Sequence, residues 1–215
     1  YKFLYNFAPH KNAVGFRVGT NVKDGATYHL GNKVILTMDI SNFFNSIKIQ
    51  TVYRLFAGLA HRYRVKNNLL AKEEVKEPET DKDSFHVAIN PDKEIQELQM
   101  LCQAVCFKGQ LPQGAPTSPA IANLATRSMD TLFSKLAEKE GMIYTRYADD
   151  ITLSHPEKSY NIGQHIKKIE TVLNQNGFNC NYKKTRILRP HRRMVVTGVV
   201  INDKLGVPKY KWRNM

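Results

Sequence analysis

Two adjacent carboxylates, Asp149 and Asp150, lie in the segment GMIYTRYADDITLS, where apolar and polar residues alternate on both sides. This alternation predicts one strand over residues 142–147 and a returning strand over residues 151–154, with the turn at 148–150. Carboxylates held this close repel each other, and one is driven toward protonation unless a cation neutralises the pair. Mg²⁺ prefers oxygen ligands and accepts one or two carboxylates together with substrate phosphates. The pair therefore indicates a magnesium site, with a solvated Asp-Asp turn as the alternative.

A third acid, Asp39, follows the apolar strand expected over residues 34–38 in the segment KVILTMDISNFFNSI. Burial of an ionised carboxylate is unfavourable unless the group is paired or binds a metal. Asp39 therefore favours a metal site at the end of this strand, and a simple strand-end cap is the alternative.

A stiff loop surrounds Gln113 in the segment LPQGAPTSPAIANL, which is rich in proline and contains Gly114. A helix is expected to follow over about residues 119–139, with Ser118 as its N-cap and Pro119 in its first turn. A rigid loop beside a helix N-terminus is suited to positioning an anion.

These elements, in this order, resemble the palm of reverse transcriptases. Asp39 with Phe43-Phe44 is similar to the family's first palm motif, LPQGAPTSP (111–119) to the second and YADD to the third. NCNYKKT is similar to the fourth motif and VVTGVV (195–200) to the fifth, the primer-grip hairpin. The resemblance runs from about residue 13 to about residue 201. It implies an α+β fold with a polymerase palm, an antiparallel sheet backed by helices, and part of a fingers subdomain.

Within the family, the chain resembles the bacterial retron type most. Arg192 followed by the Val-Thr-Gly of residues 196–198 matches a retron pattern, and YTRYADDITLS is close to the retron form. GATYH (25–29) resembles a retron Asn-Ala-x-x-His element but has Gly25 in place of the Asn. Group II intron proteins share GFR before the first motif and KTRI after it, so an intron-type or other bacterial defence enzyme remains an alternative. The retron type implies synthesis of RNA-linked single-stranded DNA in phage defence, with a cognate non-coding RNA and an effector protein as partners.

The resemblance implies an RNA-directed DNA polymerase that adds deoxynucleotides to a primer 3′ end, or to an RNA hydroxyl, on an RNA template. Two Mg²⁺ ions, for which Mn²⁺ can substitute, would activate the hydroxyl and stabilise the leaving oxygens. The implied metal ligands are Asp39, Asp149, Asp150 and the backbone carbonyl of Ile40. Lys184 is expected to protonate the departing pyrophosphate. An inactive RNA-binding protein on the same fold and a carboxylate-pair hydrolase are the alternatives.

Phe44, five residues after Asp39, resembles the steric gate that leaves no room for a 2′-hydroxyl. Phe43 and Phe44 cannot share one face of a strand, so Phe43 is expected in the core. The other residues expected to contact the incoming nucleotide are Gln113, Gly114, Arg17 and Ala148.

The charge balance points to a polyanionic partner. The chain carries 32 basic and 19 acidic residues, a formal net charge of +13. Eight of the acids and four lysines fall within residues 71–94, which leaves 28 basic against 11 acidic residues elsewhere. Such an excess is typical of nucleic-acid binding, with solvated surface charges as the alternative. The residues expected to contact template, primer or RNA–DNA hybrid are Tyr147, Lys183, Arg186, Arg189, Arg192, Arg193, Thr197 and Gly198. Lys183 is also the alternative to Lys184 as the proton donor.

The expected organisation is a partial fingers region over residues 1–32, a palm over 33–201 with an exposed charged insertion near 66–94, and over 202–215 the start of a connection to a thumb. Helices are expected near residues 49–60, 94–106, 119–139 and 160–175. Because the chain begins with Tyr and ends in KWRNM, we expect a fragment without complete fingers and thumb. No apolar run approaches the roughly 18 residues of a membrane span, so we expect a soluble, cytoplasmic, bacterial protein.

Cysteine and histidine usage adds little chemistry. Cys102 and Cys106 lie one helical turn apart on the face of Ile95 and Leu98, which predicts core packing in preference to a metal site. Three cysteines without disulfide spacing suit a reducing compartment. His29 could contact nucleic acid by family analogy, and a structural hydrogen bond is the alternative.

Overall fold

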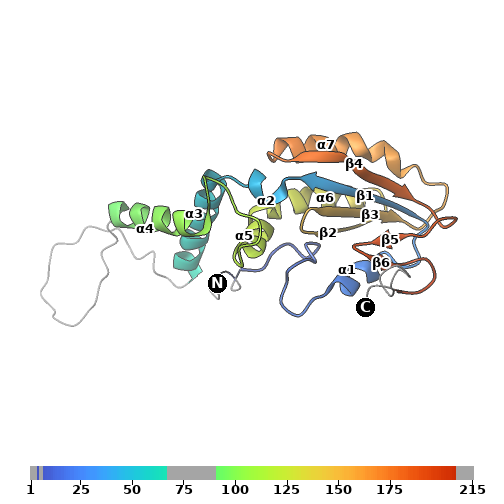
Figure 1. Cartoon of the computed structure of the whole chain (residues 1–215), viewed down its shortest axis with the longest axis horizontal. Helices are drawn as coiled ribbons and strands as arrows, with labels where there is room; N and C mark the ends of the chain where they lie inside the picture. Colours follow the sequence, from blue (N-terminus) through green and yellow to red (C-terminus); the bar gives the residue numbers. More distant parts are fainter. Residues whose placement is uncertain (1–3, 5–6, 67–90, 207–215) are drawn as a thin grey trace, which may run out of the picture.

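A four-stranded antiparallel sheet forms the centre of the protein, in the order β2-β3-β1-β4 (Figure 1). The computed structural model describes residue 4, residues 7–66 and residues 91–206 of the chain. The strands are β1 (Val34–Ser41), β2 (Ile143–Tyr147), β3 (Asp150–His155) and β4 (Asn179–Leu188). The predicted hairpin around the Asp pair is therefore confirmed, and the predicted antiparallel sheet with it.

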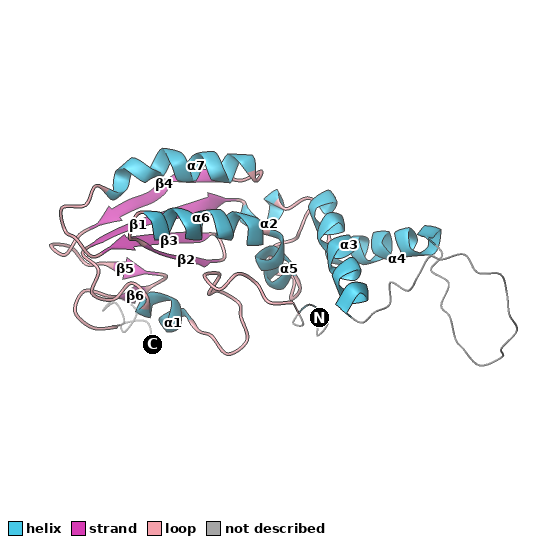
Figure 2. Cartoon of the chain, turned by 180° about the vertical axis from the view of Figure 1, so that it is seen from behind, coloured by secondary structure: helices cyan, strands magenta, loops and turns pink. Residues whose placement is uncertain are grey.

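Helices cover one face of this sheet. α6 (Arg127–Lys139) and α7 (Ile166–Gln175), the latter preceded by the short 3₁₀ helix η2 (Ile162–His165), lie across that face (Figure 2). Alternate residues of β1 supply the apolar contacts, since Val34, Leu36, Met38 and Ile40 are buried in the same core as residues of α6 and α7. This is the period of two that a strand requires.

Within the described residues, the opposite face of the sheet is covered only in part. Ile35, which points away from α6 and α7, packs in a second core with Ala26, Met194, Val196 and Ile201. These partners come from α1 (Val22–Thr27) and from the predicted hairpin with the residues that flank it; the hairpin is observed as β5 (Val195–Val196) and β6 (Val199–Val200). Farther along β1, around Thr37 and Asp39, the same face borders an open cleft.

The N-terminal segment, expected as part of a fingers region, joins the sheet. Ala13 forms a parallel bridge with Arg146 of β2, and the Arg146 carbonyl accepts the N–H of Val14 at 2.9 Å. Gly15 suits this close approach, because a Cβ there would lie only 3.1 Å from the backbone nitrogen of Ala148. Residues 13–15 thus pack directly on the turn that carries the Asp pair.

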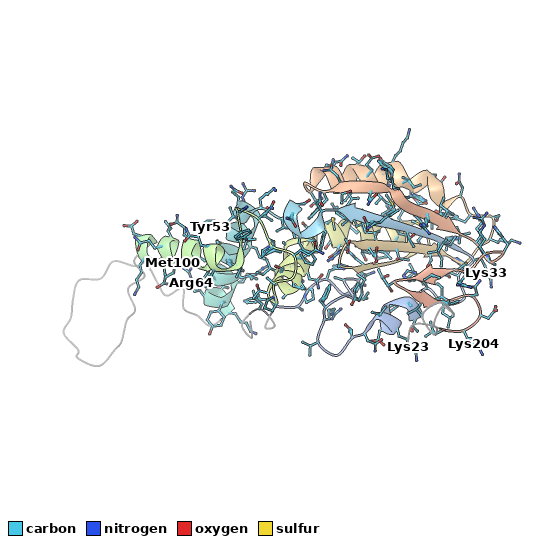
Figure 3. All side chains as sticks on the ribbon, in the orientation of Figure 1. Lys23, Lys33, Tyr53, Arg64, Met100 and Lys204 are labelled. Atoms are coloured by element: carbon cyan, nitrogen blue, oxygen red, sulfur yellow. The ribbon has the colours of Figure 1, made fainter. Side chains whose placement is uncertain are left out.

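Two helices extend away from the sheet (Figure 1). α3 (Ile49–Lys66) is longer than predicted, and α4 (Pro91–Val105) contains residues 91–94 that were expected in the insertion. Arg64 of α3 forms an ion pair with Glu94 of α4, and Figure 3 shows Arg64 and Met100 on this helix pair. The rest of the predicted insertion, residues 67–90, lies outside the described residues. None of the helices in the described ranges is long and apolar enough to cross a membrane.

The predicted core face of α4 is only partly right. Cys102 and Leu98 are buried, and Cys106 is half-buried just beyond the helix. Ile95 is 44% exposed, so it lies outside the buried stripe that Leu98 and Cys102 form.

The single helix predicted over residues 119–139 is wrong. The structure has two helices, α5 (Ser118–Ala125) and α6, separated at Thr126. The Thr126 hydroxyl donates to the carbonyl of Ala122 at 2.8 Å, and its backbone has left the helical conformation (φ −94°, ψ 8°). A threonine that bonds back to the preceding turn in this way commonly bends a helix.

The predicted capping role of Ser118 is also wrong. Thr117 occupies the cap position without a side-chain hydrogen bond, and Ser118 is the first helical residue. Its hydroxyl donates to the Pro112 carbonyl at 2.6 Å, which closes the loop around Gln113. The compact loop brings that carbonyl within reach, so the hydroxyl stabilises the loop in place of the helix end.

Candidate active site

The three predicted acids meet where β1 and β3 pair. Asp39 lies directly opposite Asp150 in the register, and Tyr147 of β2 lies opposite Asp150 on its other side. Asp149 stands in the turn between β2 and β3, where its carbonyl accepts the N–H of Ile40 at 3.0 Å. Sheet pairing therefore brings together carboxylates that are 110 positions apart in the sequence.

The acidic cluster is electrostatically strained. Desolvation, with the charges of Asp149 and Asp39, raises the pKa of Asp150 to about 6, although its residue surface remains exposed. Desolvation also raises the pKa of Asp149, and its proximity to Asp39 adds to the shift. Lys184 of β4 donates to Asp39 Oδ2 at 2.8 Å, and this contact raises the pKa of the ammonium group. The site thus holds more negative charge than one lysine offsets.

The residues of this cluster fit a divalent cation that is shared with a substrate. Among the described residues, no three acidic, histidine or cysteine side chains converge closely enough to enclose an ion by themselves. Asp39 is nevertheless close enough to Asp149 to help raise the pKa of that carboxyl, and a cation, the Lys184 ammonium, already binds Asp39. Mg²⁺ commonly takes one or two carboxylates and completes its shell with substrate phosphates and water.

A cleft of about 360 Å³ lies beside the acids. It is lined by Thr37, Met38, Asp39, Tyr147, Asp150, Thr152, Lys184, Arg186, Val195, Thr197 and Gly198. The fold therefore places seven predicted site residues around one hollow. A larger hollow of about 580 Å³ between α3 and α4 contains no carboxylate, so we assign the site to the smaller one.

The comparison with protein families agrees with this geometry. The family described as reverse transcriptase (RNA-dependent DNA polymerase) matches residues 5–201. The chain belongs to the reverse transcriptase family. Its similarity to known members is substantial, at 34% identity over 207 residues to the retron Mx65 reverse transcriptase of Myxococcus xanthus and 30% over 211 residues to the retron Ec86 reverse transcriptase of Escherichia coli. These matches cover 92% and 94% of the chain but only 43% and 53% of the two relatives.

Solved structures show the same fold at low sequence identity. Telomerase of Candida albicans, solved with a fragment of telomeric RNA, has a TM-score of 0.59 at 13% identity and covers 95% of the chain. The apo telomerase of Candida tropicalis without its C-terminal domain has a TM-score of 0.55 at 13% identity and covers 92%. The chain covers 36% and 41% of these two proteins. The predicted palm architecture of this reverse transcriptase is thereby confirmed.

Phe43 and Phe44 lie on a short helix, α2 (Phe43–Ser46), and the expected strand alternation between them is wrong. Asn42, in the left-handed region (φ 48°), turns the chain from β1 into this helix. Phe43 is buried and its ring lies 5.6 Å from that of Phe178, whereas Phe44 is half-buried. The core assignment of Phe43 is confirmed, and the gate role of Phe44 stays a prediction.

The loop around Gln113 lies next to α2. Leu111 donates its N–H to the Ile47 carbonyl at 2.9 Å, which joins the start of the loop to the end of α2. Gln113 and Gly114 are exposed, and Gly114 has the positive φ of 91° that favours glycine. The nucleotide contacts expected from both residues remain predictions.

Arg17 does not line the cleft of the acids. Its guanidinium donates to the carbonyl of Lys11 at 2.9 Å, within the same loop. With Phe16 it borders a separate hollow of about 380 Å³ against α5. Phe16 itself is exposed, and its ring lies 5.4 Å from that of Tyr147.

The predicted basic run divides into three groups. Lys184 and Arg186 face the cleft from alternate positions of β4, while Lys183, which directly precedes Lys184 in the strand, is exposed and does not line the cleft. Arg189 instead donates to the carbonyls of Lys158 and Tyr160, so its guanidinium is held by the protein. The third group, Arg192 with its neighbour Arg193, is exposed in the approach to the β5–β6 hairpin.

Sequence reasoning missed the buried side of the site. Arg146 is fully buried behind the turn, paired with Asp130 of α6. An arginine in the middle of the predicted strand, next to the Asp pair, was the available signal, because an arginine that is buried there needs an acidic partner. His29, by contrast, has the structural role that was its alternative: its ring nitrogens contact Ser154 Oγ and Thr145 Oγ1, each at 2.7 Å.

Proposed function

We propose that this chain is the palm, with part of the fingers, of an RNA-directed DNA polymerase of the retron type. It would extend a primer 3′ end, or an RNA hydroxyl, with deoxynucleotides on an RNA template. The observation that most supports this function is the pairing of Asp39 with Asp150, beside Asp149, at the edge of a cleft that basic residues also line. Family membership supports the same reaction. Partners would be RNA, RNA–DNA hybrid and deoxynucleoside triphosphates, with a cognate non-coding RNA and an effector protein in a bacterial cytoplasm.

Asp39, Asp149 and Asp150, with the backbone carbonyl of Ile40, are the proposed ligands of two Mg²⁺ ions. When bound, divalent ions of this kind lower the pKa of the attacking hydroxyl and offset charge on the leaving oxygens. Lys184 is held at the site by Asp39, and its raised pKa keeps it protonated. It is therefore placed to donate a proton to pyrophosphate.

The far wall of the cleft is proposed to hold the primer. Thr197 Oγ1 is the only buried side-chain polar atom within the described residues that lacks a hydrogen-bond partner. A buried hydroxyl without a partner is costly, so a ligand oxygen that accepts from it would be favoured. Thr197 and Gly198 form the turn of the β5–β6 hairpin, with positive φ angles of 46° and 84°, and both residues line the same cleft as Asp150. Arg186 and Tyr147 complete the proposed contact surface.

The test is incorporation of labelled deoxynucleotides on a primed RNA template, with and without Mg²⁺. Asp149→Asn removes a carboxylate charge with little change in volume, so it should abolish incorporation while RNA binding and thermal unfolding stay close to wild type. Asp203→Asn, at an exposed acid outside the cleft, is the matched control and should remain active. Residual activity of Asp149→Asn within tenfold of wild type would contradict the assignment. Metal-independent RNA binding without incorporation by the wild type would favour a non-enzymatic protein on the same fold.

A further inference from the structure

Arg146 is a fully buried arginine at the back of the active site. It lies in β2, and its Nε and Nη2 atoms donate to the two carboxylate oxygens of Asp130 at 2.7 and 2.8 Å. The hydroxyl of Tyr144 also donates to Asp130, at 2.7 Å. This two-pronged geometry orients the guanidinium as well as neutralising it.

The remaining donors of Arg146 reach other parts of the palm. Nη2 donates to Thr126 Oγ1 at 2.8 Å, at the junction of α5 and α6. Nη1 donates to the Ala148 carbonyl at 2.9 Å, in the catalytic turn. The Phe43 ring lies 5.5 Å from the guanidinium carbon. The Arg146 side chain therefore contacts the end of α5, the start of α2 and the turn that carries Asp149.

The contact with Ala148 fixes the backbone beside Asp149. Ala148 is in the left-handed region (φ 53°), which is sterically disfavoured for a residue with a Cβ. Arg146 holds the Ala148 carbonyl, and the Ile40 N–H holds the carbonyl of Asp149. Both peptide planes that flank Asp149 are thus fixed, and with them the direction in which its Cα–Cβ bond points.

We propose that Arg146 is a positioning residue that holds Asp149 in the orientation required for binding a divalent cation. The proposal rests on the proposed function. Arg146 is too deeply buried to touch substrate, so it acts through the Ala148 carbonyl. A lysine would not replace it, because one ammonium group cannot reproduce the fork of planar donors that reaches Asp130 and Ala148 together.

The competing explanation is that Arg146 only holds α6 against β2. Tyr144→Phe separates the two, since it removes a hydrogen bond to Asp130 and leaves the Ala148 contact in place. The variants to compare are wild type, Arg146→Lys, Tyr144→Phe and Asp149→Asn. Each is assayed for Mn²⁺ binding through the electron paramagnetic resonance signal of free Mn²⁺, for the Mg²⁺ dependence of incorporation, and for urea unfolding. The Mn²⁺ bound by wild type but not by Asp149→Asn defines the site.

Arg146→Lys should weaken Mn²⁺ binding at this site at least fivefold and raise the half-saturating Mg²⁺ concentration by a similar factor. Tyr144→Phe should leave both within twofold of wild type, even where it unfolds at lower urea concentration. Wild-type metal dependence in Arg146→Lys, or an equal change in Tyr144→Phe, would overturn the proposal. Should Arg146→Lys fail to fold, Arg146→Met combined with Asp130→Leu removes both buried charges together, and the same outcomes apply. Site-specific Mn²⁺ binding by a wild type that incorporates nothing would refute the polymerase function and leave the positioning test intact.

Discussion

His29 fixes the base of the catalytic hairpin, and its burial makes the protein sensitive to acid. Its Nε2 contacts Thr145 of β2 and its Nδ1 contacts Ser154 of β3, so one ring joins both strands that carry the Asp pair. The ring has no exposed surface. Burial lowers the pKa of His29 from 6.5 to about 4, because the charged imidazolium would lose its hydration.

The direction and size of the effect follow from this pKa. Above pH 6.5 the imidazole is neutral in both the folded and the unfolded chain, so its contribution to stability is complete. Between pH 6.5 and 4 the unfolded chain binds a proton that the folded protein does not. The free energy of unfolding therefore falls by about 1.4 kcal/mol per pH unit, which amounts to roughly 2.5 kcal/mol by pH 4.5.

Urea unfolding at pH 7.5, 6.5, 5.5 and 4.5 measures this contribution as the difference between wild type and His29→Gln. Glutamine can keep hydrogen bonds to both hydroxyls but does not titrate, so the variant should lose stability less steeply below pH 6.5. His191→Gln is the matched control, because His191 is exposed, and it should follow wild type. Parallel curves for wild type and His29→Gln would refute the buried, neutral state of His29.

Phe44→Ala should raise the use of ribonucleotides relative to deoxynucleotides in primer extension. Phe43→Ala should instead lower the free energy of unfolding by about 3–5 kcal/mol, because it opens a cavity in the core; a selective gain of ribonucleotide use by Phe43→Ala would show that the gate was assigned to the wrong ring. Arg192→Gln with Arg193→Gln should flatten the log–log salt dependence of hybrid binding by about 1.4–1.8 units, at about 0.7–0.9 per phosphate contact. Arg189→Gln should leave that slope unchanged, since its guanidinium binds protein carbonyls. An unchanged slope in the double variant would mean that both arginines point only into solvent.

The catalytic hairpin was predictable because the apolar–polar alternation within its own sequence determines how its two strands pair. Residues 142–154 alternate around a turn, and a sheet buried on one face by helices requires such alternation. Asp39 was predictable for a related reason, since an acid at the end of an apolar strand has few structural explanations. Both signals are local, and both depend on burial rather than on a particular partner.

The errors share the opposite property, because each depends on a particular hydrogen-bond partner that the residue pattern does not reveal. Thr126 reads as an ordinary helical residue until Arg146 is placed beside its hydroxyl, where the helix bends. Ser118 has the residue type of a helix cap, yet the Pro112 carbonyl takes its hydroxyl. Gly25, which departs from the retron pattern, packs closely against Val14, and a Cβ there would lie 2.7 Å from Val14 Cγ2.

The fixed turn also has an energetic consequence, because it holds Asp150 where its charge is disfavoured. The pKa of Asp150, raised to about 6, means that the folded protein at neutral pH prefers the protonated acid more than the unfolded chain does. An acid with a raised pKa destabilises the fold above that pKa, and the effect disappears below the pH at which both states are protonated.

Asp150→Asn should therefore stabilise the metal-free protein while it abolishes incorporation. The full shift from 3.8 to about 6 would correspond to roughly 3 kcal/mol, but solvent screens an exposed carboxylate, so we expect about 1 kcal/mol at pH 7. For a chain of this size that is a rise in unfolding temperature of about 2–4 °C. Thermal unfolding in EDTA measures it, with Asp203→Asn as the control that should leave the temperature unchanged. The advantage should shrink in millimolar Mg²⁺ and at pH 4, because bound cations or protons relieve the same repulsion in the wild type. A lower unfolding temperature for Asp150→Asn in EDTA would show that favourable contacts stabilise the Asp150 carboxylate. The interpretation of the acidic cluster as electrostatically strained would then be wrong.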